Sequence, residues 1–331
     1  MYVDLLKKNK YCMILFILSK SEGGVLLNIE LINSKISERL LSGTFEVSLF
    51  LIEKIKTHDM LEYFSFQPSI SHSLQKEIIN IIQPTIDKLV GKEQLEFNEN
   101  GRPNGVVEYC KSSYIGITYD HLFKSLQEPS ESLNEDVQKD LYCIKIEIEA
   151  GEYAYFLNRI PQFKKFSKGL WGIIADTTFR KVSDSFIGIE PGFDLLIYDN
   201  EILVVNNVSV QRIFDLKTKY VHNTNSVLCA FEETNKLEGF EQFKNDSIED
   251  GNIVKRVSRL MTKPERMTRF VENFDKIEEI IKEFDLNIEL NEEKSKIKYT
   301  DKKQLNDIVK LLNDAYYKTV LTGERGRDDL R

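Results

Sequence analysis

The sequence predicts an α+β fold in which hairpin-rich mixed sheets are surrounded by helices and divided between two subdomains. Apolar, β-rich runs occur in pairs separated by short turns, and amphipathic helical segments lie between these pairs. Strands and helices do not alternate strictly, as they would in a doubly wound parallel sheet. The most polar stretch, Gln127–Lys139, is typical of a linker. We therefore expect an N-terminal α+β region at residues 1–140 and a C-terminal α+β domain at residues 141–331.

The beginning of the chain is expected to combine strands with one helix. Cys12–Leu18 and Val25–Leu31 are apolar and flank a Glu-Gly-Gly turn, which predicts a hairpin. Leu49–Ile55 is apolar but fits a strand as well as a helix. Ile78–Val90 has isoleucines at helical spacing, and Pro84 is expected to interrupt that helix.

Turn formers and short apolar runs follow this helix. Asn98–Gly105 is dense in Asn, Gly and Pro, so it is predicted to be a loop. Two strands are expected after it, Val106–Cys110 and Tyr114–Tyr119. Leu141–Ile148 alternates apolar and polar side chains, which predicts a half-buried strand.

The C-terminal domain has clearer patterns. One hairpin is predicted from Phe193–Tyr198 and Ile202–Val205, and another from Leu286–Leu290 and Lys296–Tyr299. Amphipathic helices are expected over Val210–Asn235, Ile253–Met261, Thr262–Phe284 and Leu305–Ala315. The third of these begins with the capping-box pattern Thr-Lys-Pro-Glu, and Asp301 with Gln304 forms a second such pattern before the last.

Composition limits both the compartment and the possible partners. The 331 residues include 45 Lys and Arg against 53 Asp and Glu, a formal net charge of −8. An acidic body repels nucleic acid, so any polyanion must bind at a local basic patch. The longest apolar run, Tyr11–Leu18, is far shorter than the roughly 20 residues of a membrane helix. The four cysteines are scattered, as expected for a protein of the reducing cytoplasm.

The sequence contains none of the common catalytic or cofactor-binding motifs. HExxH, GxGxxG, GxxxxGK[ST] and GxSxG are all absent. We therefore assign no catalytic residues, no metal ligands and no cofactor, and we favour a binding protein over an enzyme. One alternative is a divalent-metal nuclease in which Asp194 and Asp215 hold the metal and Lys217 orients the attacking water.

Two segments carry positive charge against the acidic average. Asn252–Phe270 and Arg159–Lys181 each contain six basic residues and one acidic residue, a net charge of +5. In the first segment, Lys255, Arg256 and Arg259 lie opposite the apolar side of their predicted helix and should form one solvent-facing basic face. In the second, the cations alternate with aromatic residues that can stack on bases. The candidate phosphate contacts are Arg159, Lys164, Lys165, Lys168, Lys255, Arg256, Arg259, Lys263, Arg266 and Arg269.

These segments also have a simpler interpretation, because a charged helix face is commonly just the solvated side of an amphipathic helix. Val271–Glu293 carries a net charge of −7 and could pair with the basic segment before it. Its acidic helix, Glu272–Glu283, could instead contact the positively charged cytoplasmic loops of a membrane protein. An interaction module without DNA affinity is therefore a further alternative.

From about residue 153 to residue 323 the chain resembles the KwaB family of the Kiwa anti-phage defence system. The resemblance rests on Tyr155–Arg159 (YFLNR), Phe186–Asp199 (FIGIEPGFDLLIYD), Ile202–Asn206 (ILVVN), Gln211–Asp215 (QRIFD) and Leu311–Gly323 (LLNDAYYKTVLTG). It implies a cytoplasmic, self-associating DNA-binding component that works with a small multi-spanning membrane protein, KwaA. It transfers no catalytic residues to this chain. Our leading hypothesis is therefore a DNA-binding effector of phage defence that binds largely independently of base sequence.

Overall fold

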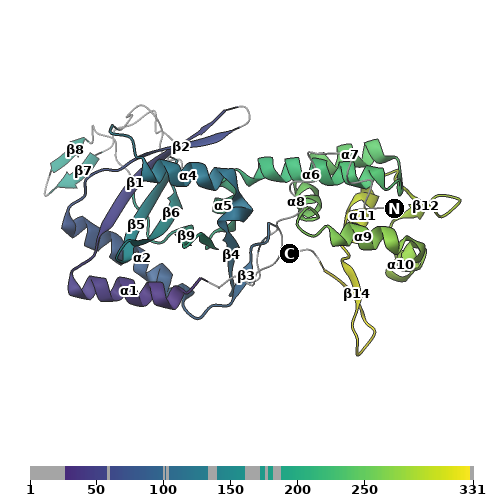
Figure 1. Ribbon diagram of the computed structural model, residues 1–331, viewed down its shortest axis with the longest axis horizontal. Helices are drawn as coiled ribbons and strands as arrows, with labels where there is room; N and C mark the ends of the chain where they lie inside the picture. Colours follow the sequence, from purple (N-terminus) through teal and green to yellow (C-terminus); the bar gives the residue numbers. More distant parts are fainter. Residues whose placement is uncertain are drawn as a thin grey trace.

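In a computed structural model, the chain forms two lobes joined by one long helix, α6 (Leu216–Glu233) (Figure 1). A large mixed sheet with helices on both faces forms the sheet lobe, and shorter helices around a small sheet form the helical lobe. This arrangement confirms the expected α+β class. The structure describes residues 27–57, 60–99, 101, 104–132, 140–160, 172–175, 178–181 and 188–328.

The main sheet has eight strands in the order β2-β1-β5-β6-β9-β10-β4-β3. All neighbouring pairs are antiparallel except β3 and β4, which run parallel. The domain boundary expected at residues 140/141 precedes β5, which pairs with β1 across that boundary. The strands are β1 (Val47–Lys56), β2 (Leu61–Phe66), β3 (Gln94–Glu96), β4 (Val107–Lys111), β5 (Leu141–Glu149), β6 (Glu152–Arg159), β9 (Leu195–Tyr198) and β10 (Glu201–Val204). A separate hairpin comprises β7 (Gly172–Ala175) and β8 (Thr178–Lys181).

Helices cover both faces of this sheet. α1 (Ile29–Ser42) and α2 (His72–Leu89) pack on one face, where they share a hydrophobic core with Ile144 and Phe156. The other face is covered by α3 (Ser112–Ile115), α4 (Ile117–Gln127), α5 (Asn207–Ile213) and the start of α6. Because the central strands are buried on both sides, the half-buried strand expected at Leu141–Ile148 is in fact covered on both faces.

Two segments expected to be strands are helical. The strand expected at Val25–Leu31 is wrong, because α1 begins at Ile29. The Asn28 side chain caps this helix by accepting a hydrogen bond of 2.9 Å from the Leu31 backbone N–H. The strand expected at Tyr114–Tyr119 is also wrong, since these residues belong to α3 and α4, which are separated by Gly116 at φ +79°.

The other expectations for the sheet lobe are largely confirmed. Leu49–Ile55 is a strand, and Val106–Cys110 corresponds to β4. The hairpin β9–β10 turns at Asp199 and Asn200, which both have the positive φ of a two-residue hairpin turn. Pro84 does not interrupt α2, which continues through it to Leu89. The strand expected at Cys12–Leu18 lies outside the described residues.

The helical lobe is built around an aromatic core. Phe231 of α6 makes edge-to-face contacts with Phe243 and Phe270, and Tyr299 packs against Phe243 in the same manner. Its elements are α7 (Phe240–Glu249), α8 (Gly251–Arg259), α9 (Glu265–Glu272), α10 (Ile277–Phe284), α11 (Leu305–Leu312), the 3-10 turns η2 (Phe274–Lys276) and η3 (Lys302–Gln304), and the strands β11 (Leu237–Glu238), β12 (Glu289–Leu290) and β13 (Ile297–Lys298). A last hairpin joins β14 (Tyr316–Lys318) to β15 (Arg325–Arg327).

The helices of this region are shorter than their patterns indicate. The helix expected over Val210–Asn235 is divided at Asp215, whose left-handed backbone (φ 48°) separates α5 from α6. The helix expected from Thr262 to Phe284 is divided by η2. Thr262 does not cap α9, because its hydroxyl donates back to the Arg259 carbonyl. The second capping box and the hairpin of β12 with β13 are both confirmed.

No helix in the described parts of the chain combines the length and the apolar character needed to cross a membrane.

Truncation of a central strand should be far more damaging than truncation on the surface. Leu157 of β6 is fully buried, so Leu157→Ala should lower the free energy of unfolding by about 2–5 kcal/mol through lost burial and a residual cavity. Ile117 of α4 is 64% exposed, and Ile117→Ala serves as the control. Urea denaturation measures both, and equal losses would contradict this description of the core.

Candidate nucleic-acid interface

A concentration of positive charge lies where α8 is followed by α9. α8 is held against α6 by apolar side chains, among them Ile253 and Val257. This packing directs the basic residues at its end away from the core. We define the basic cluster as Arg259 at the end of α8, Lys263 in the connection, and Arg266 and Arg269 on α9.

The members of the basic cluster repel one another. Burial lowers the pKa of Lys263 below its usual value, and Arg259 and Arg266 lower it further. Glu96 and Glu265 oppose this effect, but each acts less strongly than either arginine. The fold therefore holds these cations together although their proximity destabilises the charged lysine.

Arg266 and Arg269 differ in how firmly they are held. Burial lowers the pKa of Arg266, and Arg259 adds to the effect against the weaker attraction of nearby carboxylates. Arg266 Nη1 donates to Asn313 Oδ1 at 3.3 Å. The Arg269 side chain is 62% exposed and lies 3.5 Å from Asp314 Oδ2, whose side chain is 57% exposed. Such a solvated ion pair contributes little, so Arg269 can exchange this partner for a phosphate at small cost.

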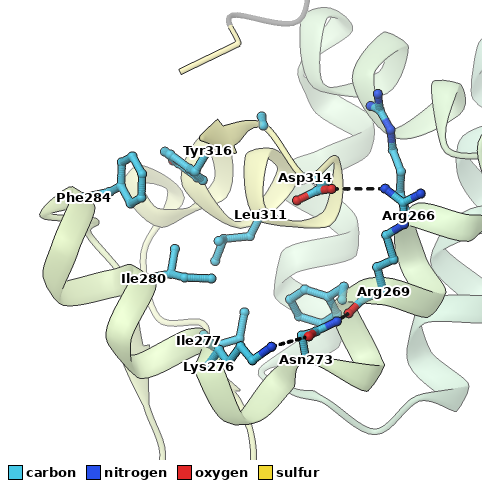
Figure 2. A pocket seen from close by; sticks show the side chains of 12 residues that line it. Arg266, Arg269, Asn273, Lys276, Ile277, Ile280, Phe284, Leu311, Asp314 and Tyr316 are labelled. Atoms are coloured by element: carbon cyan, nitrogen blue, oxygen red, sulfur yellow. Dashed lines mark hydrogen bonds and ion pairs between the residues drawn. The ribbon is translucent and has the colours of Figure 1, made fainter. Parts of the chain in front are cut away.

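The cluster adjoins a cleft of about 310 Å³ between α9, α10 and α11. Figure 2 shows Ile277, Ile280 and Leu311 along its apolar side, while Arg266 and Arg269 lie at the opposite side. The cleft therefore combines a cationic edge with an apolar interior.

Two of the expected phosphate contacts have internal roles instead. Lys255 Nζ donates to the Glu99 carbonyl at 3.2 Å, across the junction between the lobes, and burial lowers the pKa of this lysine. Arg256 Nη1 donates to Asn306 Oδ1 at 2.5 Å. Both side chains are only half-exposed. The continuous solvent-facing basic face expected for Lys255, Arg256 and Arg259 is therefore wrong, because a neighbouring loop covers part of it.

No contact among the described residues joins the second basic segment, Arg159–Lys181, to the basic cluster. Arg159 ends β6 in the sheet lobe, where its backbone N–H donates to Asp194 Oδ2 at 3.0 Å. Lys164, Lys165 and Lys168 lie outside the described residues.

The residues of the nuclease alternative have separate partners. Asp194 also accepts a hydrogen bond from the Asn206 amide, and Asp215 accepts from Lys56 Nζ at 2.5 Å and from Thr218 at 2.7 Å. Asp215 and Lys217 do line one groove of about 660 Å³ between the lobes. In the described parts of the chain, no group of three or more His, Cys, Asp or Glu side chains is arranged to hold a metal ion.

A buried acidic pair at the lobe junction was not expected from the sequence. Glu108 is 1% exposed and accepts hydrogen bonds from the Asn98 backbone and the Asn207 amide, both at 3.0 Å. Glu99 is 6% exposed and accepts from the Tyr114 hydroxyl at 2.5 Å. These hydrogen bonds offset part of the cost of burying the two carboxylates, and Lys219 and Lys255 attract Glu99 electrostatically. The pattern of the loop that carries Glu99 gave no sign of this burial.

The described residues thus define an α+β protein with a cationic site on its helical lobe. A family model described as "Kiwa protein KwaB-like" matches residues 138–322, more than half of the chain. The chain therefore belongs to the KwaB-like family and is a component of a Kiwa anti-phage defence system, as the sequence resemblance predicted. No curated protein and no solved structure matches it. The matched region includes the whole basic cluster.

The burial of the Lys263 charge and its repulsion by Arg259 and Arg266 should be measurable as a loss of stability. Because folding lowers the pKa of Lys263, the charged lysine disfavours the folded chain at neutral pH. Lys263→Met keeps the aliphatic stem and should raise the urea midpoint at about pH 7, an advantage that shrinks as the pH approaches about 10. Lys303→Met, at an exposed position of η3, is the control and should leave the midpoint unchanged. A lower midpoint for Lys263→Met would show that the lysine stabilises the fold.

Proposed function

We propose that this protein is a cytoplasmic DNA-binding effector of a Kiwa defence system. It binds DNA largely independently of base sequence, associates with copies of itself and acts with a small multi-spanning membrane protein of the KwaA type. Membership of the KwaB-like family supports a role in the defence system. The resemblance implies DNA binding, self-association and the membrane partner. The geometry of the basic cluster gives additional support to DNA binding.

The observation that carries DNA binding is the basic cluster. Its four cations lie within the short stretch from the end of α8 to the end of α9 on an acidic molecule. Burial lowers the pKa of Lys263 and Arg266, and repulsion from Arg259 lowers both further. A chain of phosphates neutralises such a site and releases condensed counterions, which is the main source of sequence-independent affinity for DNA. A polyanion would therefore relieve a repulsion that the free protein retains.

The alternatives have weaker support. A nuclease needs carboxylates that converge on one metal ion, and Asp194 and Asp215 are engaged with different partners. A docking role for the acidic helix has less support, because Glu278 is paired with Lys282 and Lys294, and Glu283 with Lys318. This leaves Glu272, Asp275 and Glu279 as its exposed carboxylates outside these pairs. DNA binding requires that Arg269 leave its solvated ion pair with Asp314, which costs little.

Reversal of charge in the cluster should weaken DNA binding and its dependence on salt. If each of the four side chains neutralises one phosphate, the logarithm of the affinity falls with the logarithm of salt concentration with a slope of about −4. The double variant Lys263→Glu/Arg269→Glu should lower affinity by at least about tenfold and reduce the size of that slope by about 2. Fluorescence anisotropy with a duplex at several salt concentrations measures both quantities.

A matched control separates the cluster from the net charge. Lys76→Glu/Lys88→Glu makes the same change of charge at two exposed positions of α2, in the sheet lobe. This variant should keep affinity within about threefold of the unaltered protein, because screening confines surface charge effects to roughly 10 Å. Equal losses in the two variants, or binding that does not respond to salt, would refute the proposed interface.

A further inference from the structure

The hairpin of β14 and β15 carries two fully exposed apolar side chains at its tip. Val320 is 99% exposed and Leu321 is 97% exposed. In Figure 1 this hairpin projects from the helical lobe, away from the other elements. Single exposed apolar residues are common on protein surfaces. Two adjacent ones at the end of a projecting ribbon are less common, and a partner that buried them would gain about 25 cal/mol per Å² of apolar surface removed from water.

The hairpin is held in one shape by its own contacts. In the turn, the Thr319 backbone N–H donates to the Glu324 carbonyl at 2.9 Å, and the Gly323 N–H donates to the Thr319 carbonyl at 2.9 Å. The Tyr317 ring lies over Gly326, where an added Cβ would collide with the ring. An aromatic ring over a strand glycine shields and stiffens that strand. The turn therefore presents Val320 and Leu321 in a defined position.

The base of the hairpin is fixed to the helical lobe beside the basic cluster. Lys318 forms an ion pair with Glu283 of α10, and the Asp328 backbone N–H donates to the Ala315 carbonyl at 2.8 Å. The Asp328 carboxylate also attracts the Arg266 guanidinium electrostatically. The end of β15 therefore lies close to the basic cluster. A ligand held by the cluster would thus lie close to the ribbon.

The ribbon itself is cationic. Lys318, Arg325 and Arg327 flank the apolar tip, against Glu324 in the ribbon and Glu283 of α10, which pairs with Lys318 and Arg325 while both side chains remain at least half exposed. Two-stranded ribbons of DNA-binding proteins enter the major or the minor groove of the duplex, and the cations of this ribbon would contact the phosphates on either side. Proteins that bind in the minor groove commonly insert apolar side chains between base pairs and so kink the duplex.

We infer that the β14–β15 hairpin enters the minor groove of DNA and that Val320 and Leu321 wedge between neighbouring base pairs, bending the duplex. The inference rests on the proposed function and adds to it a distortion of the ligand. Unstacking a base step costs a few kcal/mol, which the burial of the two side chains and the larger interface with the bent duplex offset. Bending should therefore depend on the tip, whereas most of the affinity should depend on the basic cluster.

The test separates bending from binding. A duplex of about 30 base pairs carries a donor and an acceptor dye at its two ends, so that bending raises energy transfer. The unaltered protein should raise the transfer on saturation. The double variant Val320→Ser/Leu321→Ser keeps every charge, so it should bind within about tenfold of the original affinity and leave the transfer at the value for free DNA. The control Leu41→Ser removes an 89% exposed apolar side chain from the sheet lobe and should retain full bending.

Each outcome has a defined meaning. If the unaltered protein binds DNA without raising energy transfer, or if the double variant bends DNA as well as the original does, the inference is wrong while the proposed function stands. If the unaltered protein does not bind DNA at all, both are wrong. Vesicles of phosphatidylglycerol provide a last comparison: if the serine variant loses vesicle binding but still bends DNA, the tip contacts membrane and the inference is overturned.

Discussion

The sharing of α6 between two hydrophobic cores is the constraint on which the rest of the structure depends. Leu216 and Tyr220 near its start pack into the core of the sheet lobe, and Leu228 and Phe231 near its end pack into the core of the helical lobe. α8 repeats this division, since Val254 belongs to the first core and Val257 to the second. The two lobes are therefore joined by continuous apolar packing as well as by the chain. The basic cluster, at the end of α8, takes its position from both.

The basic residues in the middle of α8 and at its end affect stability in opposite ways. Near its middle, Lys255 extends to the Glu99 carbonyl and strengthens the junction between the lobes. At its end, the fold gathers Arg259, Lys263 and Arg266, although burial and repulsion from Arg259 disfavour the charges of Lys263 and Arg266. Selection for stability alone would disperse such a group, so its retention is typical of a site that serves a ligand.

The sequence predicted best those elements whose patterns are local. The β9–β10 hairpin followed from two apolar runs and an Asp-Asn turn, and the capping box at Asp301 followed from its own side chains. Tyr114–Tyr119 was misassigned because a short apolar run fits a helix as well as a strand, and only tertiary packing decides between them. The charge pattern singled out the segment that contains the basic cluster. It could not show that Lys255 turns inward, because its acceptor on Glu99 is 156 residues away in the chain.

The left-handed residue Asp215 has a mechanical consequence. It stands between α5, which is fixed to the sheet, and α6, which carries the helical lobe, and the Lys56 and Thr218 side chains hold its carboxylate. The 18-residue α6 is about 27 Å long, so a swing of about 10° at this joint would displace its far end by about 5 Å. The hydrogen bonds and the ion pair around the Asp215 carboxylate therefore help to set the angle between α6 and the sheet lobe.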